Sequence, residues 1–175
     1  MELVDRIPAV QLGPLRDRFG MMIDLRWVER LASVEGWMVA NRRYLRSERR
    51  RGQNEMRALL AALAIEPPVL QPLVLEVIGT AFELCGVRDG AEGATIVRSP
   101  TSLDVRLQAC PTYERLIASG WRGVTACGSY HRRDGWYRAV GTFPEEVLTG
   151  EQKWGDPYCS VVITFSHEKA NRVAR

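Results

Sequence analysis

The chain has 175 residues, of which 46% are apolar and 26% are charged, and its formal net charge is +3. This length and composition predict a globular domain with its own core and exclude a disordered chain. No run of about 18 uncharged apolar residues is present, so the sequence predicts no membrane-spanning helix and no membrane partner. The first residues lack a basic segment followed by an apolar one, and we therefore expect a cytoplasmic protein.

The basic residues are almost all arginine, since only Lys153 and Lys169 of the 24 are lysine. Guanidinium groups bind oxyanions with two hydrogen bonds, but the same bias is typical of a G+C-rich genome. One block concentrates six arginines between positions 42 and 51. We predict exposed helix surface there and no nucleic-acid partner, because a nucleic-acid site would also need several stacking aromatic residues.

Helical periodicity dominates the first half of the chain, after an arm over residues 1–13 that is predicted to have little structure. Apolar residues recur every three or four positions in four segments, and helices are predicted over residues 14–23, 25–49, 54–63 and 69–84. Gly52 is expected to separate the second helix from the third. Pro67 and Pro68 are expected to end the third helix.

The second half of the chain changes to strand-like alternation. The predicted strands cover residues 95–98, 103–107, 145–154 and 158–165, with a short helix over 112–118 and partial helix within 121–137. This order predicts an α+β fold, in which a helical N-terminal half packs on a small antiparallel sheet with an inserted helix. We expect a single domain over 1–175, with a helical half (14–86), a sheet-containing half (87–167) and a polar tail (168–175).

The side chains with the most potential for catalysis or metal binding belong to four cysteines: Cys85, Cys110, Cys127 and Cys159. Their separations contain no C-x-x-C pair, which excludes a zinc ribbon or a thioredoxin-like motif, and in the cytosol the thiols should be reduced. Cys85 follows an apolar helix face and is predicted to be a buried core thiol. No motif for a serine hydrolase, a P-loop, a dinucleotide site or a zincin is present.

His131 lies four residues after Cys127. On a helix this spacing would place the thiol and the imidazole on one face, which suits a thiolate–imidazolium pair or two ligands of one metal ion. The alternative is a surface histidine, whose neighbours Arg132 and Arg133 would disfavour its protonated form. His167 lies in the polar segment after the last strand and is predicted to be uninvolved.

An ordered series of short motifs runs through the second half: Cys110-Pro111, then Cys127, then Gly155-Asp156-x-x-Cys159 before an alternating apolar strand. In this respect residues 95–166 resemble the L-2-amino-thiazoline-4-carboxylic acid hydrolase family of small bacterial proteins. The resemblance implies a hydrolase that opens a cyclic C=N bond in a small polar metabolite, within a biosynthetic pathway. No cofactor is required by such a reaction, although zinc and a homo-oligomer remain open.

The resemblance also implies roles for particular side chains. A nucleophile could come from Cys110 or Cys127, and Cys110 stands just before a predicted helix, whose dipole favours a thiolate. His131 or Asp156 could move protons, and Cys159 would lie close by. Arg98 or Arg106 on the sheet could bind a substrate carboxylate. For Asp156 the alternative is ordinary turn chemistry, and for Cys159 it is packing within a strand.

The 4-vinyl reductase-type small-molecule-binding domain provides a second resemblance, since it too ends in a glycine turn and a cysteine-bearing strand after a helical start. This resemblance implies a non-catalytic small-molecule or metal sensor. Both resemblances predict that Cys110, Cys127 and Cys159 converge at one pocket, with Cys85 apart from them.

Overall fold

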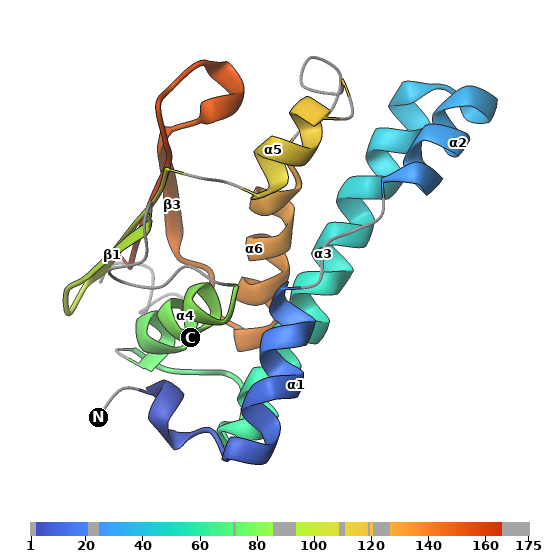
Figure 1. The fold of residues 1–175 in the computed structure, drawn as a ribbon. Helices are drawn as coiled ribbons and strands as arrows, with labels where there is room; N and C mark the ends of the chain where they lie inside the picture. The colour runs from blue at the N-terminus through green and yellow to red at the C-terminus, as the bar shows by residue number, and fades with distance from the viewer. Residues whose placement is uncertain are drawn as a thin grey trace, which may run out of the picture.

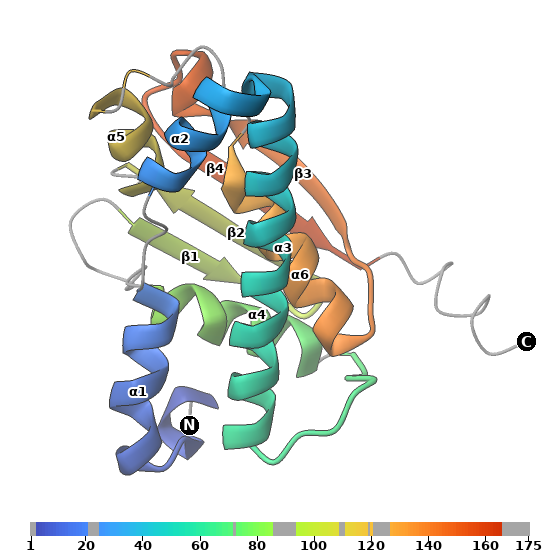
Figure 2. The same cartoon turned by 90° about the vertical axis from the view of Figure 1, so that its right-hand side faces the viewer.

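Four antiparallel strands form one sheet in the order β1-β2-β4-β3 (Figure 2). The computed structural model describes residues 3–20, 25–71, 73–85, 94–108, 111–118, 120 and 127–165. Within it the strands are β1 (Ala94–Arg98), β2 (Ser102–Leu107), β3 (Glu145–Gly150) and β4 (Cys159–Thr164). The hairpin β1–β2 joins the hairpin β3–β4 through the pairing of β2 with β4, so β4 lies inside the sheet.

Helices cover one face of this sheet in two layers. They are α1 (Ala9–Gly20), α2 (Arg26–Glu35), α3 (Trp37–Ala62), α4 (Leu73–Leu84), α5 (Pro111–Ala118) and α6 (Gly128–Val140), with short 3-10 turns η1 (Leu3–Arg6) and η2 (Gln152–Trp154). Helix α6 lies between the sheet and α3 (Figure 1). The predicted α+β fold, with a helical N-terminal half and an antiparallel sheet, is confirmed.

The helix-facing side of the sheet supplies much of the core. Alternation puts Leu103 and Val105 of β2 on the same face as their β4 partners Ile163 and Val161, and all four are at most 5% exposed. They join the buried side chains of α4, of which Ile78 is fully buried, in one continuous apolar cluster. This burial fixes the register of the two central strands, because a one-residue slip would expose every one of these side chains.

Glycines allow α3 and α6 to cross at very short range. A Cβ added at Gly52 of α3 would lie 2.9 Å from the carbonyl carbon of Arg132 in α6, and closer still to its oxygen. A Cβ added at Gly135 of α6 would lie 2.8 Å from the backbone nitrogen of Gln53, and one at Gly128 would lie 2.7 Å from Glu48 Cγ. Close packing at these three glycines therefore sets where the start of α6 lies.

A buried carboxylate locks the same helices together. Glu55, which is 1% exposed, accepts hydrogen bonds from Arg51 Nε (2.7 Å), from Arg132 Nε (2.7 Å) and Nη2 (2.9 Å), and from Trp136 Nε1 (3.1 Å). The two arginines also donate to the carbonyl oxygen of Phe19, near the end of α1. Paired and hydrogen-bonded in this way, the buried charges fix α1, α3 and α6 relative to one another.

The position of one helix break differs from the prediction. Helix α2 ends at Glu35 and is followed by Gly36, whose φ of 85° is a conformation that favours glycine. Helix α3 then runs without interruption through Gly52. Gly52 is therefore a packing residue rather than a helix boundary, because its missing side chain admits the backbone of α6.

The N-terminal arm also differs from the prediction of little structure. Leu3–Arg6 form η1, α1 begins at Ala9 rather than at Pro14, and both Leu3 and Ile7 are 5% exposed within the main core. Helix α4 begins at Leu73 instead of Val69, because the Val69 N–H donates to the carbonyl of Val140 (2.8 Å) and its own carbonyl accepts from Thr142 Oγ1 (2.9 Å).

The arginine block on α3 is only partly exposed surface. Arg42, Arg43, Arg46 and Arg50 are exposed, as predicted. Arg49 instead forms an ion pair with Asp134 of α6, and Arg51 turns inward to Glu55.

Within the described ranges, every helix is either too short or too polar to span a bilayer.

Candidate functional site

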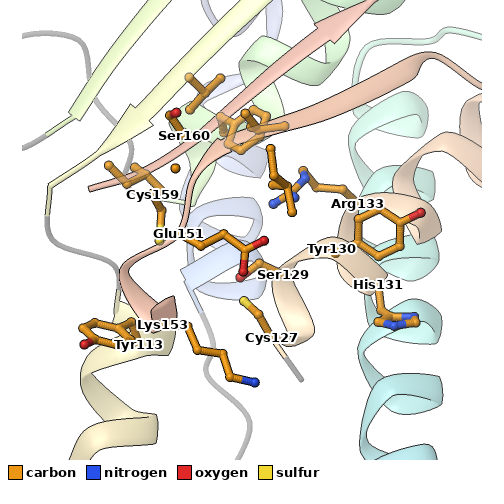
Figure 3. Close-up of a pocket in the computed structure, with 16 residues that line it drawn as sticks. Tyr113, Cys127, Ser129, Tyr130, His131, Arg133, Glu151, Lys153, Cys159 and Ser160 are labelled. Carbon is orange, nitrogen blue, oxygen red and sulfur yellow. The ribbon is translucent and has the colours of Figure 1, made fainter. Parts of the chain in front are cut away.

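A cavity of about 230 Å³ lies against the helix-facing side of the sheet, near the start of α6 (Figure 3). Its apolar walls come from β2, β3, β4 and α4. Its polar side chains come from α5, the first half of α6, the connection between β3 and β4, and the start of β4. The residues that line it are Phe82, Val105, Leu107, Tyr113, Cys127, Ser129, Tyr130, His131, Arg133, Leu148, Gly150, Glu151, Lys153, Cys159, Ser160 and Val161.

Cys127 occupies the position just before α6. Its backbone is extended (φ −66°, ψ 121°), and the helix begins at Gly128. The first amides of a helix lack intrahelical acceptors and carry a partial positive charge, which stabilises an anion at this end of the cavity. Gly128 is close-packed against Tyr44 and Glu48 of α3, so the helix start and the thiol beside it have a fixed position.

The connection between β3 and β4 carries the charged groups of the cavity. Glu151 directly follows β3, and Lys153 lies in the 3-10 turn η2. In the view of Figure 3 the Glu151 carboxylate and the Cys127 thiol point toward each other, and Lys153 extends toward the same side. In this view a carboxylate, a thiol and an ammonium group, all from residues that line the cavity, therefore lie toward one side of it.

Hydrogen bonds within this connection hold it in shape. The Asp156 carboxylate accepts from the backbone N–H of Glu151 (2.8 Å), and Gly155 adopts a φ of 108°. Gln152 Nε2 donates to the carbonyl of Gln108 after β2 (2.5 Å). Asp156 thus performs the turn role that the sequence left as an alternative, and it positions Glu151 without lining the cavity.

Cys159 opens β4 and points into the same cavity. Its sulfur accepts from the Gln152 backbone N–H (3.4 Å) and donates to Gln152 Oε1 (3.7 Å). Cys127 and Cys159, which are 32 positions apart in sequence, thus both line this cavity, whereas Cys110, the third member of the predicted group, lies outside the described residues. Cys85 packs against the main core, and its burial raises the pKa of its thiol to about 11.

His131 has a different environment from the predicted pair with Cys127. Because Cys127 precedes the helix and has an extended backbone, the spacing of four residues does not bring the two side chains together. Figure 3 shows the imidazole pointing away from the thiol, and His131 Nδ1 lies 3.4 Å from Arg49 Nη2. Burial and the Arg49 charge lower the pKa of His131. Because the Arg49 guanidinium can only donate hydrogen bonds, Nδ1 of His131 is the acceptor. The neutral imidazole therefore carries its proton on Nε2.

A buried ion pair forms one wall of the cavity. Arg133 donates to both Glu146 oxygens (2.9 and 2.6 Å), and Tyr137 donates to Glu146 Oε2 (2.5 Å). Burial alone would lower the pKa of Arg133, but the hydrogen bonds and charge of Glu146 raise it overall. Burial and the Glu146 charge also raise the pKa of Tyr137. This pairing fixes edge strand β3 against α6 and leaves the Arg133 guanidinium committed to Glu146.

The two arginines predicted to bind a carboxylate do not line the cavity. Arg98, on edge strand β1, forms an ion pair with Glu83 of α4. Arg106 lies between two cavity-lining residues of β2, so strand alternation directs it to the opposite face, where it approaches Asp104 (3.5 Å) and the Tyr158 ring. Cys110, the other predicted nucleophile, and His167 lie outside the described residues.

Sequence reasoning missed several polar residues of the cavity: Tyr113, Ser129, Tyr130, Arg133, Glu151 and Lys153. Glu151 and Lys153 immediately precede the Gly155-Asp156 turn, so the turn motif itself pointed to their segment. The predicted strand over 145–154 hid them, because it ends at Gly150 and η2 follows.

Comparison with known proteins finds no matching family model, no matching curated protein and no matching solved structure. Among the described residues, no group of three or more His, Cys, Asp and Glu side chains could hold a metal ion. The candidate function therefore depends on the geometry of the cavity.

Proposed function

We propose that this chain is a thiol-dependent hydrolase that opens a cyclic C=N bond in a small carboxylate-bearing molecule, and that Cys127 is its nucleophile. The structural observation that carries the proposal is that Cys127, Glu151 and Lys153 line one cavity and, in the view of Figure 3, lie toward the same side of it. The resemblance of the cysteine series to thiazoline-carboxylate hydrolases supports the same reaction class.

The proposed reaction adds one molecule of water across the C=N group in successive steps. Glu151 accepts the proton of the Cys127 thiol, and the sulfur adds to the C=N carbon while the π electron pair moves to nitrogen. The nitrogen takes the proton from Glu151. Water then forms a bond to the same carbon as a ring bond to that carbon breaks, and Glu151 transfers one water proton to the ring atom that leaves. The oxygen next forms a carbonyl, the carbon–sulfur bond breaks, and the remaining hydroxyl proton returns to the Cys127 sulfur.

Binding would use both ends of the cavity. The Lys153 ammonium would pair with the substrate carboxylate, and the positive end of α6 would add to this attraction. The apolar side chains of β2 and β4, with Phe82, would contact an apolar side of the ring. A volume of about 230 Å³ favours a ligand with one ring or two. The proposed substrate is therefore amphipathic rather than polar throughout.

One observation favours a second candidate, a non-catalytic small-molecule-binding module. The His131 imidazole points away from Cys127, so the described residues supply Glu151 but no histidine base at the thiol. A binding module would use the same cavity and the same Lys153, without turnover.

The test is a turnover assay on a panel of thiazoline and cyclic amidine carboxylates. We expect Cys127→Ser to lose turnover while it remains folded by circular dichroism, because a hydroxyl ionises far less readily than a thiol. Cys85→Ser is the matched control, and its activity per folded molecule should be unchanged. Glu151→Gln should lower kcat by about 100-fold or more, in the range of general acid–base contributions.

Two results would overturn the proposal. Full activity of Cys127→Ser would exclude this nucleophile and transfer the role to Cys110. Tight binding of panel members without turnover by the native chain would establish the binding module instead.

A further inference from the structure

A second cleft lies between the end of α1 and the middle of α3. It encloses about 690 Å³ and is open to solvent. Its polar lining comprises Arg18, Ser47, Arg50, Arg51, Asn54, Glu55 and Arg57. The cleft is separate from the thiol-bearing cavity and shares no lining residue with it.

The cleft has an excess of positive charge. Arg51 is neutralised by Glu55, the only acidic residue among the described residues that line the cleft, and Arg132 shares that carboxylate. Among the described residues, Arg18, Arg50 and Arg57 form no ion pair. Three guanidinium groups therefore face one concave surface with no carboxylate of their own.

The backbone beneath these side chains is fixed. Positions 47, 50, 54 and 57 follow the spacing of one helix stripe, so their side chains share a face of α3. The end of α1, which carries Arg18, is tied to α3 and α6 where Phe19 accepts hydrogen bonds from Arg51 and Arg132. Folding thus places the guanidinium groups on two elements whose relative position is set by buried bonds.

We propose that this cleft binds a small molecule that carries two or more linked phosphoryl groups. Guanidinium forks match phosphate oxygens with two hydrogen bonds each, which a surface of lysines would not do. Arg50 and Arg57 are separated by about 10 Å along the helix axis, so two linked phosphoryl groups can engage both with less convergence of the side chains than a single phosphate requires. Ser47 and Asn54 supply neutral donors on the same helix stripe. This site is independent of the proposed hydrolase activity.

The test is isothermal titration calorimetry of the full chain with inorganic pyrophosphate, at low salt and at physiological salt. The cleft variant is the double substitution Arg50→Gln with Arg57→Gln. The matched control is Arg42→Gln with Arg46→Gln, because these residues are exposed on the same helix but do not line the cleft. All four side chains are exposed, and circular dichroism would confirm that both variants fold.

We expect one pyrophosphate per chain, with an affinity that falls by about tenfold or more in the cleft variant and stays unchanged in the control. Equal weakening in both variants would mean a diffuse charge effect and would overturn the proposal. So would the absence of binding at low salt. Tighter binding of a short single-stranded oligonucleotide, weakened equally by both variants, would instead establish a general nucleic-acid surface and refute the small-molecule site.

Discussion

Replacing Gly52 with alanine should reveal how much the close crossing of α3 and α6 contributes to stability. The new Cβ would lie 2.9 Å from the Arg132 carbonyl carbon and closer still to its oxygen. Carbon atoms pack at about 3.5–4.0 Å, so the two helices would have to separate by about 1 Å. The Cβ position is fixed by the backbone of α3, and the atoms that it would meet belong to the backbone of α6, so no side-chain rotation can relieve the contact.

The expected cost follows from two opposing effects. Overpacking of a tight contact costs about 3 kcal/mol, at the upper end of its usual range. Alanine regains about 1 kcal/mol over glycine within a helix. The net loss for Gly52→Ala is therefore about 2 kcal/mol, which lowers the Tm by roughly 4–8 °C for a chain of this size.

Gly13→Ala is the matched control. Gly13 lies within α1, and a Cβ added there would have no other atom within 4 Å, so alanine should stabilise the chain by about 1 kcal/mol or less. Urea unfolding followed by circular dichroism would measure both variants, with an unchanged m-value as the sign of a pure stability effect. The reasoning is refuted if Gly52→Ala is as stable as the native chain, or if both variants shift in the same direction.

Four further outcomes are expected. Glu55→Gln should destabilise the fold by about 3 kcal/mol in urea unfolding, because it leaves the mostly buried Arg132 guanidinium without its carboxylate partner. His131 should titrate by NMR below its ordinary pKa of 6.5, which means that protonation of the ring favours the unfolded chain. The free energy of unfolding that the neutral ring contributes should therefore decline as the pH falls below about 6.5. His131→Gln should remove this pH-dependent component. Lys153→Gln should raise KM by about tenfold in the turnover assay, whereas Arg106→Gln, on the opposite face of the sheet, should leave it unchanged. Peptide mapping after iodoacetamide treatment at pH 8 should show Cys85 as slow to react, because burial raises the pKa of its thiol to about 11.

Periodicity predicted the fold well where a single face of an element is buried. The alternation of Leu103 and Val105 identified β2, and the apolar run after Cys159 identified β4. Periodicity failed at Gly52, because the sequence pattern of a helix-breaking glycine does not differ from that of a glycine that admits another helix. Only the position of α6, which is tertiary information, distinguishes the two.

The sequence predicted only part of the candidate site, because the rest also depends on tertiary structure. Motifs identified Cys127 and Cys159, since both flank regular elements whose ends meet at the cavity. The pairing of Cys127 with His131 depended on the exact start of α6, and a shift of one position took the thiol out of the helix. For the positive side chain that binds the substrate carboxylate, the sequence favours the arginines of the sheet. The cavity instead contains Lys153, which the irregular turn η2 places there.

The most direct test of the proposed mechanism is peptide mass spectrometry of the protein after acid quenching during turnover of a thiazoline carboxylate. We predict a covalent adduct with the mass of the added substrate on the peptide that contains Cys127, and its absence from the peptides that contain Cys85 and Cys159. Accumulation of the adduct on the Cys110 peptide, or turnover that proceeds at the native rate in Cys127→Ser with no adduct on any cysteine, would contradict the proposed role of Cys127.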